Sequence, residues 1–166
     1  MYNPIDIANY FLKKYGEQNS ITPMKLVKLV YISHGWHLGI TGNALIDENP
    51  EAWKYGPVIP TVYHHFKKFG GNAIKLNSFN PDPFTVISKE IQSFLDKIWD
   101  VYGTFSALQL SAKTHQINTP WYISWNKLQQ IRRKNKLGVL SYQISDNLIK
   151  DYYNQKFNIN KGKAIA

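Results

Sequence analysis

Apolar side chains recur every three or four residues over several stretches of the chain, which is the spacing of an amphipathic helix. In residues 4–15 this stripe contains Ile5, Ala8, Phe11 and Leu12, and a possible Asn3 cap precedes it. The same spacing predicts further helices over residues 60–69, 86–102, 106–114 and from about 145 to 153. Residues 121–131 fit either another short helix or an irregular packed segment.

The most apolar stretch, residues 22–39, predicts the main helix. Thr22 is a good N-cap, and Pro23 suits the first helical position. Leu26, Leu29 and Ile32 belong to an apolar set that covers more than one face of this helix. A helix that is apolar on most sides usually lies at the centre of its domain.

Residues 44–58 have a different pattern and predict a small β-hairpin, or at least an extended ordered loop. Two short apolar runs, 44–46 and 52–55, flank the polar residues 47–50, and Gly56-Pro57 then breaks the chain. The predicted fold is therefore mostly α with a small β-hairpin. We expect one compact helical domain of about six helices over residues 1–153, followed by a polar, flexible tail over residues 154–166.

Composition excludes several classes of protein. The chain has 166 residues, enough for one domain, and no cysteine, which excludes a disulfide scaffold, a thiolate zinc site and a cysteine nucleophile. No apolar run approaches the roughly 18 residues of a membrane span. Asp6 stands where a signal peptide has positive charge. We therefore expect a cytoplasmic protein without a membrane partner.

Positive charge is concentrated in the second half of the chain. The net charge is +9, of which residues 1–83 carry +2 and residues 84–166 carry +7. The sharpest cluster is Arg132, Arg133, Lys134 and Lys136, which follows the aromatic residues of the 121–131 segment. Such a cluster can bind a nucleic-acid backbone. A solvated helix end explains it better, because no nucleic-acid-binding motif accompanies it.

Histidines supply the only candidate metal ligands worth weighing. His34 and His37 are one turn apart on the main helix, and His64 and His65 are adjacent on the next helix. The pattern lacks the HExxH spacing of zinc enzymes, so structural histidines are the better interpretation. We predict neither a metal nor a cofactor.

The sequence also contains few candidate catalytic groups. Only 11 carboxylates are present, and no phosphate-binding glycine loop occurs. Ser33-His34 and the pair Ser111 and His115 have the residue types of a nucleophile and its base. Neither lies in a nucleophile elbow such as GxSxG. We therefore predict that the protein is not an enzyme.

Three stretches resemble a known family when they are taken together. They are DIANYFL from Asp6, ITPMKLVKLVYISHGW from Ile21 and EAWKYGPVIPTVY from Glu51. The chain resembles the Panacea domain family of SocA-like, phage-associated (GepA-type) bacterial antitoxins. The likeness is strong over residues 5–70 and thin beyond them.

The resemblance implies an antitoxin of a bacterial or prophage toxin–antitoxin system, which neutralises a cognate toxin by direct protein contact. One branch of the family acts as an adaptor that delivers its toxin to a bacterial protease. Family members are not typically enzymes. A nucleic-acid-binding regulator that uses the basic second half is the alternative function.

The motif residues suggest a partner-binding surface. Lys25 and Lys28 are one turn apart, so they would share an exposed edge of the main helix that Tyr31 extends. Trp53 and Tyr55 alternate to one side of an extended segment, which would make them a hot spot if that side faces outward. The alternative is that the motif locks the hairpin onto the main helix. The motif residues predicted to be structural are His34, Trp36, Gly56, Pro57 and Tyr63.

Overall fold

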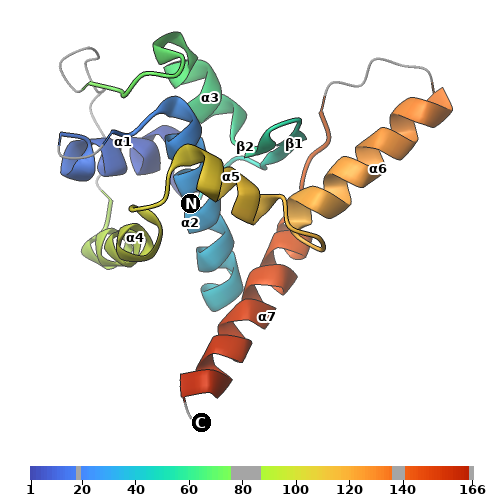
Figure 1. Cartoon of the computed structure of the whole chain (residues 1–166). Coiled ribbons are helices and arrows are strands. Elements are labelled where there is room, and N and C mark those ends of the chain that lie inside the picture. The colour runs from blue at the N-terminus through green and yellow to red at the C-terminus, as the bar shows by residue number, and fades with distance from the viewer. Residues whose placement is uncertain (18–19, 76–86, 136–140, 165–166) are drawn as a thin grey trace.

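Helix α2 (Pro23–Thr41) lies at the centre of the molecule, as its apolar pattern predicts. The computed structural model describes residues 1–17, 20–75, 87–135 and 141–164. Within them it has seven α-helices, one short 3-10 helix and a two-stranded antiparallel sheet, which confirms the predicted fold class. Figure 1 shows most of the other helices arranged around α2. Leu26, Leu29 and Ile32 are buried, as predicted.

The first and third helices match their predicted bounds closely. In α1 (Pro4–Tyr15) the Asn3 side chain accepts a hydrogen bond from the backbone of Ile5, which caps the helix. Helix α3 (Pro60–Phe66) continues into a 3-10 turn, η1 (Lys67–Phe69), so together they fill the predicted range 60–69. Both α1 and α3 pack against α2.

The hairpin is present, but its turn lies further along the chain than predicted. Strand β1 (Glu51–Trp53) pairs with β2 (Gly56–Val58), so the turn is residues 54–55 rather than 47–50. Gly56 has a φ of 104°, which favours glycine and allows the tight turn. Residue Ile46, which we expected in the hairpin, forms an isolated bridge with Tyr2 instead.

Serine caps fix the starts of the next two helices. Helix α4 (Lys89–Tyr102) begins after Ser88, three residues later than predicted, and residue 86 lies outside the described part of the chain. Helix α5 (Ala107–Thr114) begins after Ser106 with a full capping box, because the Gln109 side chain also accepts from the Ser106 backbone. The prediction for α5 is confirmed.

The last two helices are longer than predicted. Helix α6 (Pro120–Asn135) is a regular helix, and Figure 1 shows it pointing away from the other helices. Helix α7 (Asp146–Ala164) continues well past residue 153, so the predicted end of the last helix is wrong. The polar residues after Tyr153 contain no helix-stop signal before Gly162. The flexibility of residues 154–166 stays a prediction.

Helix α7 packs closely against α2 because two glycines of α2 leave room for it. Gly35 and Gly39 lie one turn apart and face Tyr153. A Cβ on Gly39 would lie 2.7 Å from the backbone nitrogen of Asn154, which is too close. Figure 1 shows the two helices side by side. This contact fixes α7 against the centre of the domain.

Candidate functional site

The two lysines of the α2 motif are buried, so the predicted exposed edge is wrong. Lys25 is 8% exposed and its Nζ donates to the carbonyl of Gly103, 2.6 Å away. Lys28 is 2% exposed and its Nζ donates to the carbonyl of Pro57, 2.9 Å away. Tyr31 is also buried. The residues that cover these side chains come from distant parts of the chain, which the helical spacing alone does not reveal.

Lys28 is held in an environment that disfavours its charge. Burial lowers the pKa of its amine to about 7. Gly56 lies directly against it, since a Cβ there would be 2.7 Å from Nζ. Glycine at this position therefore serves two purposes: it permits the positive φ of the turn and it lets the amine reach the Pro57 carbonyl. The pair Gly56-Pro57 thus joins the hairpin to α2.

Next to Lys28 the surface has an apolar groove of about 690 Å³. Its walls come from the start of α2, the hairpin, α3 and α5. Besides Lys28, the lining includes Met24, Val27, Trp53, Tyr55, Val58, Tyr63 and Leu108. The groove therefore brings together Lys28, Trp53 and Tyr55 of the predicted partner-binding residues. It does not include Lys25 or Tyr31.

The hairpin presents two aromatic side chains to this groove in different ways. Trp53 is half-buried, packs edge-to-face on Tyr63 at 4.9 Å between ring centroids, and donates from Nε1 to Glu51. Tyr55 is 68% exposed. From α5, Leu108 is 74% exposed at the same groove. Trp53 is thus fixed in place, whereas Tyr55 and Leu108 leave open apolar area at the surface.

The groove has a positive electrostatic character despite its apolar walls. Lys54 and Lys67 line it together with Lys28, and both are exposed. Among the described residues that line it there is no carboxylate. An apolar surface with lysines and no acid attracts an apolar segment that carries acidic side chains.

Behind the groove, α5 is tied to the hairpin. The Ser111 hydroxyl donates to the carbonyl of Tyr55 over 3.2 Å and lies 3.3 Å from Nδ1 of His115. The ring of His115 packs on Trp121, whose Nε1 donates to the carbonyl of Trp53 over 2.8 Å. The serine and histidine considered as a nucleophile and its base therefore help to position the groove.

The remaining motif residues on α2 contact other helices. His34 is fully buried, and its Nε2 lies 3.0 Å from a carboxylate oxygen of Asp146 at the start of α7. The Trp36 indole donates to the Tyr102 hydroxyl of α4 over 2.9 Å. Together they brace α2 against α7 and α4.

The histidines do not gather at one point. His37 contacts the carbonyl of Asn43, and His64 and His65 are exposed on α3. Within the described residues, no group of three or more His, Asp or Glu side chains is arranged as metal ligands would be.

The basic segment lies on a different element from the groove. Arg133 and Lys134 are exposed near the end of α6, and Arg132 lies over the ring of Trp125 at 5.6 Å. Lys136 lies outside the described residues. None of these residues lines the groove.

Comparison with known proteins identifies the family. The model of the family described as "Antitoxin SocA-like, Panacea domain" matches residues 26–122. The chain belongs to this family. A curated relative from Caulobacter vibrioides (strain NA1000 / CB15N), "Antitoxin SocA", is 31% identical over 156 residues, which cover 89% of this chain and 80% of the relative. None of the solved structures compared with the chain matches it.

Family membership suggests that the chain serves as an antitoxin in a toxin–antitoxin pair and implies a cognate toxin partner. It also suggests a role other than catalysis. The family match includes every side chain of the groove named above except Met24. No helix among the described residues is long and apolar enough to cross a membrane.

Sequence reasoning missed Leu108 as a groove residue. Leu108 and Leu110 are the large apolar residues of α5, but only Leu110 is buried. Two residues at i and i+2 lie on different faces of a helix, so one of the two leucines had to face outward. That spacing was the available signal.

Proposed function

We propose that this protein is an antitoxin that neutralises its cognate toxin by direct binding, and that the toxin binds in the groove beside Lys28. The observation that carries the proposal is the combination of open apolar area and positive charge at one place. Tyr55, in the hairpin turn, and Leu108, on α5, are large, exposed side chains at the groove. An exposed apolar patch is typical of an interaction site, and tyrosine is enriched among binding hot spots.

The chemistry of the groove specifies the kind of segment that fits. We expect an apolar stretch of the toxin to cover Val27, Val58 and Leu108, and an acidic side chain beside it to approach Lys54 or Lys67. Lys28 lies beneath them with an amine whose pKa is close to neutral. A carboxylate that enters the groove would stabilise its charged form.

Growth rescue tests the binding surface. The probe is the product of a small gene beside this one that stops growth when expressed alone. We expect Leu108→Glu to abolish rescue, because it places a negative charge in a groove built for an acidic segment. Ile117→Glu is the matched control, since Ile117 is 72% exposed but does not line the groove. Full rescue by Leu108→Glu would contradict the proposed surface.

The route of neutralisation has its own readout. If the antitoxin delivers the toxin to a protease, co-expression shortens the half-life of the toxin in cells. If it blocks the toxin by contact alone, the half-life stays the same or lengthens. Leu108→Glu is expected to remove either effect, because both require the complex.

The end of α6 supports a second candidate function, nucleic-acid binding. Arg133 and Lys134 are exposed on a helix that points away from the domain (Figure 1), and Trp125 is nearby for base stacking. This function predicts a gel shift that weakens steeply with salt and is reduced by joint Arg133→Glu and Lys134→Glu substitution. A flat salt dependence would exclude it.

A further inference from the structure

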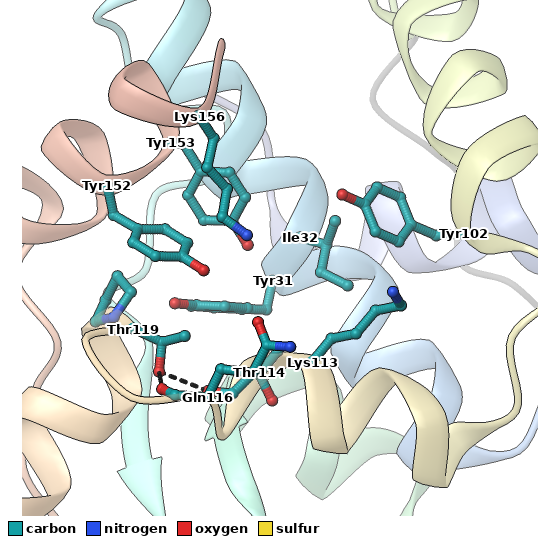
Figure 2. A pocket seen from close by; sticks show the side chains of 11 residues that line it. Tyr31, Ile32, Tyr102, Lys113, Thr114, Gln116, Thr119, Tyr152, Tyr153 and Lys156 are labelled. Carbon is teal, nitrogen blue, oxygen red and sulfur yellow. Dashed lines mark hydrogen bonds between the residues drawn. The ribbon is translucent and has the colours of Figure 1, made fainter. Parts of the chain in front are cut away.

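A second hollow, separate from the groove, lies between α2, α5 and α7. Its volume is about 110 Å³, enough for a few water molecules or one small oxyanion. Tyr31 enters it from α2, Tyr152 and Tyr153 from α7, and Lys113 from α5. Figure 2 shows the hydroxyls of Tyr31, Tyr152 and Tyr153 turned toward the same space, with the amine of Lys156 beside the Tyr153 hydroxyl.

Two of these tyrosines are buried without a protein partner for their hydroxyls. Tyr31 is 2% exposed and Tyr153 is 6% exposed. Neither hydroxyl makes a hydrogen bond to another described residue, and neither oxygen is among the fully enclosed polar atoms without a partner, so both open into the hollow. A hydroxyl that opens into a hollow and has no protein partner is free to bind water or a ligand. The hydroxyls therefore point to an occupant of the cavity.

The hydroxyls are available as donors. Burial raises the pKa of both Tyr31 and Tyr153, so each keeps its proton at neutral pH. The two threonines at the cavity are already engaged: Thr114 donates to the carbonyl of Ser111, and Thr119 to that of Thr114. Free hydrogen-bonding capacity in the cavity thus lies with the tyrosines and with the side-chain amide of Gln116.

The charged side chains that line the cavity, among the described residues, are all positive. Lys113 and Lys156 line it and are exposed, and no carboxylate is present among the described lining residues. Within the described chain neither lysine forms an ion pair. Lys156 lies over the Tyr152 ring, 4.7 Å from its centroid. Uncharged donors inside and ammonium groups at the rim together favour an anion.

We infer that this cavity binds a phosphate group through the hydroxyls of Tyr31, Tyr152 and Tyr153 and the amine of Lys156, with Lys113 at its rim. Four donors from α2 and α7 suit the four oxygens of phosphate better than the two of a carboxylate. The phosphate is either free or carried by a small molecule that projects past the lysines. The inference does not rest on the proposed antitoxin function.

Calorimetric titration with inorganic phosphate tests the site, with acetate and chloride at equal ionic strength as comparison anions. We expect phosphate to bind the wild type more tightly than acetate does. Tyr31→Phe and Lys156→Gln should each weaken phosphate binding about tenfold, because each removes one hydrogen bond to a charged group. Lys150→Gln is the control, as it removes an exposed lysine of the same helix that does not line the cavity.

The outcomes are distinct. Tighter binding of a nucleoside monophosphate than of inorganic phosphate would show that the group is carried by a small molecule, and the reverse order would identify free phosphate. Equal phosphate binding by the wild type and by Tyr31→Phe and Lys156→Gln would overturn the inference. A phosphate effect on melting temperature that persists in these variants is a general salt effect and would also contradict it.

Discussion

Helices α2 and α5 line both the groove and the cavity, yet the two hollows differ in size, polarity and depth of charge. The groove is large and apolar, and its one buried polar side chain is the amine of Lys28. The cavity is small and lined by tyrosine hydroxyls, with lysines only at its rim. Helix α2 supplies Lys28 to the first and Tyr31, one turn later, to the second.

This difference shows what a short helical motif can encode. Residues i and i+3 lie on the same side of a helix, so Lys28 and Tyr31 are neighbours along one face of α2. The hairpin covers the first and α7 covers the second. The identity of the covering element, rather than the position on α2, decides whether the hollow is apolar or polar.

A substitution at the contact between α2 and α7 should have the largest effect, and it should affect the cavity more than the groove. We expect Gly39→Ala to lower the free energy of unfolding by about 2–3 kcal/mol, because its Cβ would meet the backbone of Tyr153 and Asn154. Urea unfolding measures this loss. Phosphate binding should suffer more than toxin binding, since α7 lines only the cavity.

Gly71→Ala is the matched control for that substitution. A Cβ there meets nothing within 4 Å, so the change should be under about 0.5 kcal/mol. If Gly39→Ala were as stable as Gly71→Ala, the close packing of α7 on α2 would be wrong.

The buried amine of the groove gives a pH-dependent effect. Below pH 7 Lys28 is charged in both the folded and the unfolded chain, so the folded state bears the full cost of the buried charge. As the pH rises above 7, the folded amine loses its proton while the unfolded one keeps it, and the wild type gains stability. We therefore compare the free energy of unfolding of Lys28→Met with that of the wild type. We expect this difference to favour the variant more at pH 6 than at pH 9, by on the order of 2 kcal/mol.

Chemical unfolding at the two pH values measures this difference. Loss of the hydrogen bond to Pro57 affects both measurements, so the difference between them reports the amine's titration. Lys54→Met removes an exposed lysine of the same groove and should change stability by less than about 0.5 kcal/mol at either pH. The same effect of Lys28→Met at pH 6 and pH 9 would mean that Lys28 is not buried as described.

Two tyrosine substitutions at the cavity give the smallest effects. Tyr102→Phe removes the acceptor of the Trp36 indole and should cost about 1 kcal/mol. Tyr31→Phe removes a hydroxyl without a protein partner and should change stability by less than about 0.5 kcal/mol in phosphate-free buffer. Thermal unfolding of both variants checks this order, and a larger loss for Tyr31→Phe would reveal a hydrogen bond that the structure lacks.

Local features of the fold could be predicted from the sequence. The long-range contacts that bury a side chain could not. Asn3, Thr22 and Ser106 cap their helices through hydrogen bonds within three residues, so local pattern was sufficient. The burial of Lys25 and Lys28 depends on Gly103 and Pro57, which are 78 and 29 residues away. A long lysine side chain fits an exposed and a buried position equally well in a helical pattern.

The candidate site shows the same division. Trp53 and Tyr55 were predicted because aromatic residues alternate in a short extended segment, and both line the groove. Leu108 and the four tyrosines of the cavity could not be assigned to these sites from the sequence, because α4, α5 and α7 meet α2 only through the tertiary fold.

The affinity of the purified toxin for three forms of this protein tests the central proposal most directly. Calorimetry should give similar dissociation constants for the wild type and Ile117→Glu, and binding about 30-fold weaker or worse for Leu108→Glu. The two substituted leucine and isoleucine side chains are almost equally exposed, so only their positions differ. Equal affinity of all three forms would contradict the assignment of the groove as the toxin-binding surface.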